Sequence, residues 1–261
     1  MKTIYYHFGY PLSASQVCLL IKAAGFDGTS FWWSDKYDAD YRSHPDIARK
    51  AGLFVENVHA PFEKMNNIWL DNFDGDEITD KLLKCIDDCA NANVPTIVMH
   101  SSFGETIPVN EIGLKRFDLL VNRAEQKNVN IALENMRKTS INLQTGQLLE
   151  RYNTPHLGFC FDNGHDNARV SKEAECDMLS RFGNRLMALH LHDNNGVDDQ
   201  HLLPFDGTTD WAAIMKKIGE TGYTGAVSLE LSIQKHENLT PEKFLAIAFE
   251  RVNKLERLMQ A

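Results

Sequence analysis

Histidine and aspartate side chains are concentrated in one short stretch of the chain. It runs His190-Leu191-His192-Asp193-Asn194 and continues a few residues later with Asp199-Gln200-His201. The apolar run 185–189 precedes it directly and predicts a buried strand. Imidazole and carboxylate groups at this spacing can converge on a divalent cation. The stretch therefore predicts part of a metal site, provided that other strands deliver ligands to the same place.

The surrounding sequence alternates short apolar runs with amphipathic helical stretches. The apolar runs are residues 3–6, 28–33, 53–58, 94–99, 129–133, 157–161, 185–189 and 225–229. The helical stretches are residues 13–24, 41–51, 77–92, 111–127, 145–152, 173–182, 211–221 and 241–259. Strands that alternate with helices form parallel sheets, and eight such units in about 250 residues close most simply as a (β/α)8 TIM barrel.

No compositional break or linker divides the chain, so we predict a single domain spanning residues 1–261. The rival architecture is a doubly wound open sheet. The first loop, residues 9–13, lacks the glycine-rich dinucleotide fingerprint, which weakens that rival and predicts no nucleotide cofactor.

Six consecutive predicted strands end in a side chain able to bind metal. These side chains are His59, His100, Glu134, Asp162, His190 and Glu230, with His165 close behind Asp162. The carboxyl ends of barrel strands share one rim, where active sites lie. Any one of the six could be an ordinary loop or capping residue, but together they predict a shared site for a divalent metal (Mn, Zn, Co or Mg).

The remaining histidines do not follow this pattern. His7 and His44 are expected to be ordinary surface or loop residues, and His156 precedes its strand and should lie on the opposite rim. His236 lies beyond the eighth strand and is given no role.

Composition limits the partners and the compartment. The net charge of −9 argues against a general polyanion binder, because neutralising phosphates requires clustered lysine and arginine. The N-terminus lacks a signal-peptide core, and no apolar run is long enough to span a membrane. Five cysteines without framework spacing favour a reducing, cytoplasmic location. A small metabolite is the expected partner, with homo-oligomerisation left open.

Several short motifs resemble a known superfamily. They are His-Ala-Pro-Phe from 59, Leu-Glu-Asn from 133, Phe-Asp-Asn-Gly-His from 161, His-Leu-His-Asp from 190 and Leu-Glu-Leu from 229. Their order and spacing resemble the xylose isomerase-like barrels, which include sugar isomerases and epimerases and the endonuclease IV family. The resemblance covers essentially the whole chain.

The two branches imply different metal sites. Resemblance to the sugar branch implies one metal held by Glu134, Asp162, His190 and Glu230, with His165 contacting substrate. Resemblance to the endonuclease IV branch implies three zinc ions and adds His59, His100, His165, Asp199 and His201. The chain has a candidate residue at each of these positions.

We expect a metal-dependent isomerase or epimerase of a small sugar, polyol or sugar phosphate. Glu134 and Glu230 would exchange protons beside a carbonyl through a metal-stabilised enediolate. The alternatives are a trinuclear-zinc phosphodiesterase acting on abasic-site DNA, a dehydratase or lyase, and a barrel that binds without turnover. Many aspartates and glutamates in the predicted rim loops argue against DNA, because an acidic rim repels a duplex.

Substrate-binding candidates lie near the same rim. They are His165, the aromatic residues Trp32, Trp33 and Trp69, and Arg137, which could receive a phosphate or carboxylate together with Lys138. Trp69 could alternatively pack its long loop onto the barrel.

Overall fold

The computed structural model describes residues 1–36, 38–169 and 177–260. Its eight strands are parallel and pair in the order β7-β6-β5-β4-β3-β2-β1-β8. They are β1 (Lys2–Tyr5), β2 (Gly28–Trp32), β3 (Phe54–His59), β4 (Thr96–Met99), β5 (Asn130–Glu134), β6 (Leu157–Asp162), β7 (Leu186–His190) and β8 (Val227–Leu229). A parallel bridge between Leu191 and Leu229 joins β7 to β8, so the sheet forms a nearly closed ring. The predicted (β/α)8 barrel is confirmed.

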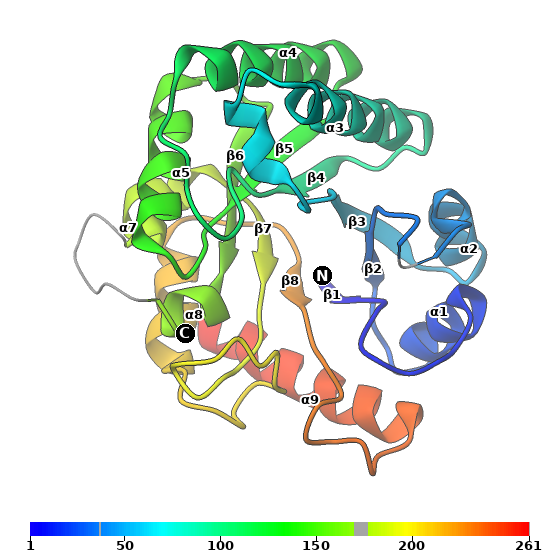
Figure 1. Ribbon diagram of the computed structural model, residues 1–261. Helices are drawn as coiled ribbons and strands as arrows, with labels where there is room; N and C mark the ends of the chain where they lie inside the picture. Colours follow the sequence, from blue (N-terminus) through cyan, green and yellow to red (C-terminus); the bar gives the residue numbers. More distant parts are fainter. Residues whose placement is uncertain (37, 170–176, 261) are drawn as a thin grey trace.

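Helices surround this ring (Figure 1). The longer ones are α1 (Ala14–Ala23), α3 (Phe73–Asn91), α4 (Glu111–Lys127), α5 (Thr139–Arg151), α8 (Trp211–Glu220) and α9 (Pro241–Gln260). The shorter ones are α2 (His44–Lys50), α6 (Asn163–Asn167) and α7 (Met178–Phe182), with 3-10 turns at Tyr41–Ser43, Met65–Trp69 and Gly183–Arg185. None of the helices in the described part of the chain is long and apolar enough to cross a membrane.

Two helices begin earlier than apolar periodicity predicts. α3 begins at Phe73 instead of 77, because the Asn72 side chain accepts a hydrogen bond from the Gly75 amide and caps a first turn that is mostly polar. α5 begins at Thr139 instead of 145, and its N-cap residue, Lys138, makes no side-chain capping bond. The helix predicted over 173–182 falls partly outside the described residues, and α7 accounts for its last five positions.

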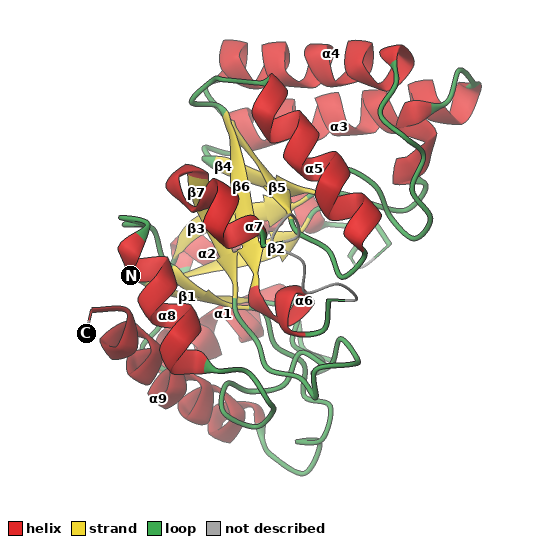
Figure 2. Cartoon of the chain, turned by 90° about the vertical axis from the view of Figure 1, so that its left-hand side faces the viewer, coloured by secondary structure: helices red, strands yellow, loops and turns green. Residues whose placement is uncertain are grey.

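The barrel interior explains how the strands present their last residues. Small inward side chains from four adjacent strands, Val98, Ala132, Cys160 and Ala188, form one buried cluster. Side chains two positions apart on a strand point to the same face. Each strand therefore places its next inward residue one layer nearer the carboxyl end; these residues are His100, Glu134, Asp162 and His190. Long loops gather at this end of the barrel, beyond α6 (Figure 2).

Candidate metal centre

His190, the last residue of β7, lies at the middle of the carboxyl end of the barrel. Its Nδ1 atom lies 3.2 Å from Glu134 Oε1 and 3.1 Å from Glu230 Oε2. Asp162 Oδ2 lies 3.9 Å from the same nitrogen. All four side chains are buried, and their ligand atoms lie within 4.8 Å of one another. The structure thus brings together the four residues implied by the sugar-branch resemblance.

A second group shares Glu134. His59 Nε2 and His100 Nε2 lie 3.2 Å and 3.1 Å from Glu134 Oε2, the oxygen that faces away from His190. The glutamate therefore places one oxygen in each group and could bridge two cations.

A third group is built around Asp199, in the loop between β7 and α8. Asp199 Oδ2 lies 3.1 Å from His165 Nε2 and 3.5 Å from His201 Nε2. His192 lies between Asp199 and Asp162, with its Nε2 atom 3.7 Å from Asp199 Oδ1 and 3.2 Å from Asp162 Oδ1. The residues predicted for a larger site therefore also converge.

The hydrogen bond from Tyr5 fixes the tautomer of His190. The Tyr5 hydroxyl donates to Asn57 Oδ1 at 2.7 Å, so its oxygen is left to accept from His190 Nε2–H at 2.9 Å. Nδ1 of the neutral ring then carries a lone pair aimed at Glu134 and Glu230. A lone pair facing carboxylates is unfavourable unless a proton or a cation lies between them.

Three other histidines are held in a similar way. In each of them one ring nitrogen donates to a backbone carbonyl, in place of the tyrosine hydroxyl, and the other nitrogen faces a carboxylate. The carbonyl bonds are His59 Nδ1 to Ala60 at 2.8 Å, His165 Nδ1 to Asn135 at 2.9 Å and His201 Nδ1 to Glu230 at 3.1 Å. Metal-binding histidines are held in this way by their second hydrogen bond. The donor set therefore fits one or more divalent cations, and nitrogen with carboxylate oxygen suits zinc, manganese or cobalt.

The electrostatics of the protein without a bound ion agree with this interpretation. Burial lowers the pKa of His190, but the groups around it, including Glu230 and Glu134, outweigh burial and hold the pKa well above the usual histidine value. For His201 burial is outweighed by Asp199 and Glu230, and the pKa rises to about 9. Burial raises the pKa of Glu230, yet His190 and His201 bring it down to about 2. His190 and His201 retain protons that a cation would displace, so metal binding should depend on pH.

A cavity of about 450 Å³ opens above these groups. One wall is aromatic: Trp32 lies 5.6 Å from Phe62, and Phe62 lies 4.7 Å from Phe103, measured between ring centroids. Glu134, Asp199 and Glu230 line the floor, and Arg137 and Lys138 line the wall that follows β5. The cavity is of a size that encloses one small molecule.

The tryptophans predicted to bind substrate lie in different places. Trp32 lines the cavity, but Trp33 does not. Successive side chains of a strand alternate, so Trp33 points outward, packs against Tyr41 at 4.9 Å and donates to Asp88 Oδ2 at 3.3 Å.

Trp69 also lies outside the cavity and is 1% exposed. It packs on Phe117 and donates to the Ser101 carbonyl at 3.0 Å. It therefore fastens its loop to the barrel, which was the alternative prediction. The candidates His165, Arg137 and Trp32 do face the cavity.

Some expectations about other residues were wrong or incomplete. His44 is not a surface residue: it is 1% exposed, packs against Tyr6 and Phe31, and lies 3.0 Å from Asp38. His192 was given no role, although its place among neighbouring histidines was a usable signal; it is buried and stacks on His201 at 4.0 Å.

Asp193 and Tyr5 have different functions from the ligands near them. Asp193 accepts from the Phe205 and Thr209 amides and from Trp211 Nε1, and so shapes the loop that carries Asp199. Tyr5 carried no sequence signal, because its partner His190 is 185 residues away.

The barrel and its histidine–carboxylate centre define a class of protein, and sequence comparison supports that class. The family model described as xylose isomerase-like TIM barrel matches residues 18–249, and the chain belongs to this family. An uncharacterized protein of Sinorhizobium fredii is 30% identical over 255 residues, covering 83% of this chain and 80% of that protein. An uncharacterized protein of Methanocaldococcus jannaschii is 28% identical over 224 residues, covering 77% and 73%.

Solved structures share the fold at lower identity. A D-tagatose 3-epimerase-like protein superposes with a TM-score of 0.74 at 21% identity, covering 97% of this chain and 99% of that one. The IolI protein with a bound zinc atom gives a TM-score of 0.76 at 20% identity, covering 100% and 98%. D-allulose 3-epimerase from Methylomonas sp. in complex with D-allulose gives 0.76 at 15% identity, covering 97% and 96%.

Proposed function

We propose that this protein is a divalent-metal-dependent isomerase or epimerase of a small sugar, polyol or sugar phosphate. One observation carries the proposal. Glu134 and Glu230 come from β5 and β8, and both reach His190 Nδ1, at 3.2 Å and 3.1 Å, on the floor of a cavity suited to one small molecule. Two carboxylates that approach one centre from different strands can work on either side of a bound substrate.

The residues of the chain would divide the work as follows. A divalent ion bound by Glu134, Asp162, His190 and Glu230 would supply Lewis acidity toward a substrate carbonyl and its neighbouring hydroxyl. One glutamate carboxylate takes the proton from the carbon next to the carbonyl. Return of a proton to the former carbonyl carbon, with the neighbouring hydroxyl proton passing to the former carbonyl oxygen, completes an isomerisation. Return of a proton to the opposite face of the original carbon completes an epimerisation. His165 would hold a substrate oxygen, and Trp32 would pack on the face of the sugar.

Burial keeps competing water away from this proton transfer. Glu134 is 2% exposed and Glu230 is 6% exposed, and the pKa of each carboxyl is held low by His190 against the effect of burial. Both are therefore ionised at neutral pH, which is the state that a carboxylate needs in order to accept a proton. The fold neighbours described as a D-tagatose 3-epimerase-like protein and D-allulose 3-epimerase add support from proteins of the same architecture.

A second candidate function is metal-dependent phosphodiester hydrolysis. The observation that favours it is the larger set of ligands: His59 and His100 flank the far oxygen of Glu134, and His165 and His201 flank Asp199. Three cations would suit hydrolysis of abasic-site DNA. The net charge of −9 and a cavity of about 450 Å³ fit a small substrate better than a duplex.

The test combines a metal count with a proton-exchange assay. Protein purified without chelator is analysed for bound elements, then reloaded separately with manganese, cobalt, zinc or magnesium. Ketose and ketose-phosphate substrates are incubated with it in D2O, and NMR follows deuterium entering the carbon next to the carbonyl. Exchange that requires metal supports the proposal. Three zinc ions per chain together with rapid cleavage of abasic-site DNA, without exchange, would establish the second candidate instead.

A further inference from the structure

The charged residues that line the cavity are divided between two regions. The acidic ones, Glu134, Asp199 and Glu230, all belong to the histidine–carboxylate centre on the floor. Apart from the histidines of that centre, the remaining charged side chains among the described lining residues are Arg137 and Lys138, which are both cationic. They lie together on the loop between β5 and α5, so the cavity has a metal-binding floor and one positively charged wall.

Arg137 is the cation with unused hydrogen-bonding capacity. It forms no ion pair with any described carboxylate, whereas Lys138 lies 2.7 Å from Glu105. Its Nη2 atom donates to the Val197 carbonyl, and its Nε atom is buried without an acceptor. A buried donor that lacks an acceptor is costly, and a charged donor more so. A ligand that supplies an anionic oxygen would remove that cost.

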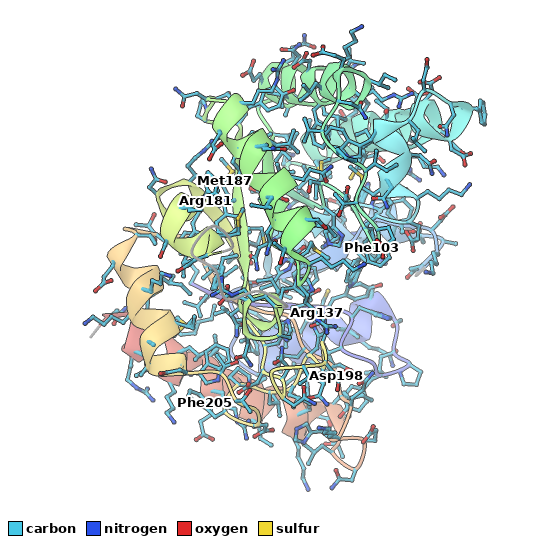
Figure 3. The ribbon with its side chains drawn as sticks, turned by 60° about the vertical axis from the view of Figure 1, so that its left-hand side comes forward. Phe103, Arg137, Arg181, Met187, Asp198 and Phe205 are labelled. Carbon is cyan, nitrogen blue, oxygen red and sulfur yellow. The ribbon has the colours of Figure 1, made fainter. Side chains whose placement is uncertain are left out.

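The backbone around Arg137 also favours an anionic ligand. α5 begins two residues later, at Thr139, without a side-chain cap and without an acidic residue in its first turn. The partial positive charge of the helix N-terminus is therefore not neutralised by its own sequence. Val197, the residue that Arg137 contacts, is in the same loop as Asp198 and Asp199 (Arg137 and Asp198 are labelled in Figure 3). The guanidinium is thus held between two loops at the edge of the cavity.

We propose that Arg137 binds an anionic group, a carboxylate or a phosphate, at one end of the substrate while the carbonyl end faces the centre on the floor. This inference rests on the proposed function and narrows its substrate to sugar acids or sugar phosphates. The guanidinium presents parallel N–H donors that match either anion in a bidentate pair. The floor carboxylates oppose an anion, which places the charged group at the Arg137 end.

Binding of three matched probes tests this assignment. D-Fructose is neutral, D-fructuronate carries a carboxylate in place of the terminal hydroxymethyl group at C6, and D-fructose 6-phosphate carries a phosphate there. Dissociation constants are measured by calorimetry at constant ionic strength on the manganese-loaded protein. We expect one anionic probe to bind about tenfold or more tightly than D-fructose. The preferred anion shows whether the group is a carboxylate or a phosphate.

Two variants isolate the side chain. Arg137→Met should abolish the preference, so that the anionic probe binds no more tightly than D-fructose. Arg151→Met removes the same charge from the exposed far end of α5, and it should change neither the preference for the anionic probe nor the binding of D-fructose. Equal binding of all three probes by the wild type, or a preference that survives Arg137→Met, would overturn the assignment.

A second readout separates this inference from the proposed function. Deuterium exchange into D-fructose without an anion preference would leave the isomerase proposal standing and exclude the role of Arg137. An anion preference that Arg137→Met abolishes, with no exchange into any probe, would support Arg137 and count against the isomerase.

Discussion

Glu134 and Glu56 are glutamates buried inside the same barrel, but they have different neighbours. Glu134 is surrounded by imidazoles, and although burial raises its pKa, His190, His100 and His165 bring it well below the usual value. Glu56 lies deeper in the barrel, where its carboxyl accepts from the Thr3 hydroxyl, and burial raises its pKa to about 7. Burial alone therefore does not decide the charge of a carboxyl group. Cationic neighbours keep Glu134 ionised and able to hold metal, whereas burial that is only partly offset by hydroxyl hydrogen bonds leaves Glu56 about half protonated at pH 7.

The largest effect should come from Glu134→Gln, which removes the shared carboxylate with little change in shape. We expect loss of the bound divalent ion and a fall in the rate of substrate proton exchange of about 10³-fold. Glu56→Gln is the matched control and should keep both the bound ion and the rate of proton exchange. Element analysis and exchange in D2O measure the two effects. A Glu134→Gln protein with undiminished metal content would show that the two glutamates do not differ as described.

The second prediction concerns stability against pH. The pKa of Glu56 is raised from 4.5 to about 7 in the folded chain. The folded state thus holds more protons than the unfolded state between these values, and stability falls as pH rises through them. A shift of this size corresponds to about 3 kcal/mol lost by pH 8.

Glu56→Gln should make this decline shallower by about that amount, and the histidines with raised pKa account for the decline that remains; urea unfolding of chelator-treated protein at pH 5 and pH 8 would measure the difference. The control is Glu220→Gln, on the surface of α8, where the pH dependence should match the wild type. If the stability of Glu56→Gln declines with pH as steeply as that of the wild type, the pKa of the Glu56 carboxyl is not raised in the folded protein.

A smaller effect is expected when the support of His190 is removed. Tyr5→Phe takes away the oxygen that accepts from His190 Nε2, so the ring loses the bond that fixes its tautomer. Loss of such a support typically weakens metal binding about 10- to 100-fold. Competition with a fluorescent chelator would measure the affinity. Tyr152→Phe, which removes a hydroxyl that donates to Asp118 at 2.6 Å, should leave it unchanged. Equal metal affinities in Tyr5→Phe and Tyr152→Phe would show that the Tyr5 hydroxyl does not support metal binding by His190.

The smallest effect on activity should come from the tryptophan outside the cavity. Trp69→Phe removes the bond to the Ser101 carbonyl, with an expected loss of about 1 kcal/mol of unfolding free energy and no change in KM. Trp32→Ala should raise KM, because Trp32 lines the cavity. A raised KM in Trp69→Phe would show that the loop carrying Trp69 takes part in substrate binding.

Much of this arrangement follows from local sequence patterns. Strand–helix alternation predicts the barrel, and barrel geometry then requires residues at the strand ends, such as His100, Glu134 and His190, to meet at one rim. The grouping of the candidate ligands was therefore predictable without knowing any distance.

Features that depend on long-range packing were not predictable in this way. Whether Trp69 covered the cavity or the barrel wall depended on contacts with Phe117 and Ser101, far along the chain. The short helix α6 escaped prediction because Asp162 ends β6 and also caps the next turn through the His165 amide. One residue that serves two elements leaves no loop between them.

The contact between Tyr5 and His190 has a consequence for the order of folding. β1 pairs with β2 on one side and β8 on the other, so Tyr5 reaches its final place only when the first and last strands meet. Contacts between such distant parts of a chain form late, because a long loop must close first. We therefore expect full metal affinity to appear in the last kinetic phase of refolding. A bound divalent ion should then stabilise the closed barrel and slow its opening.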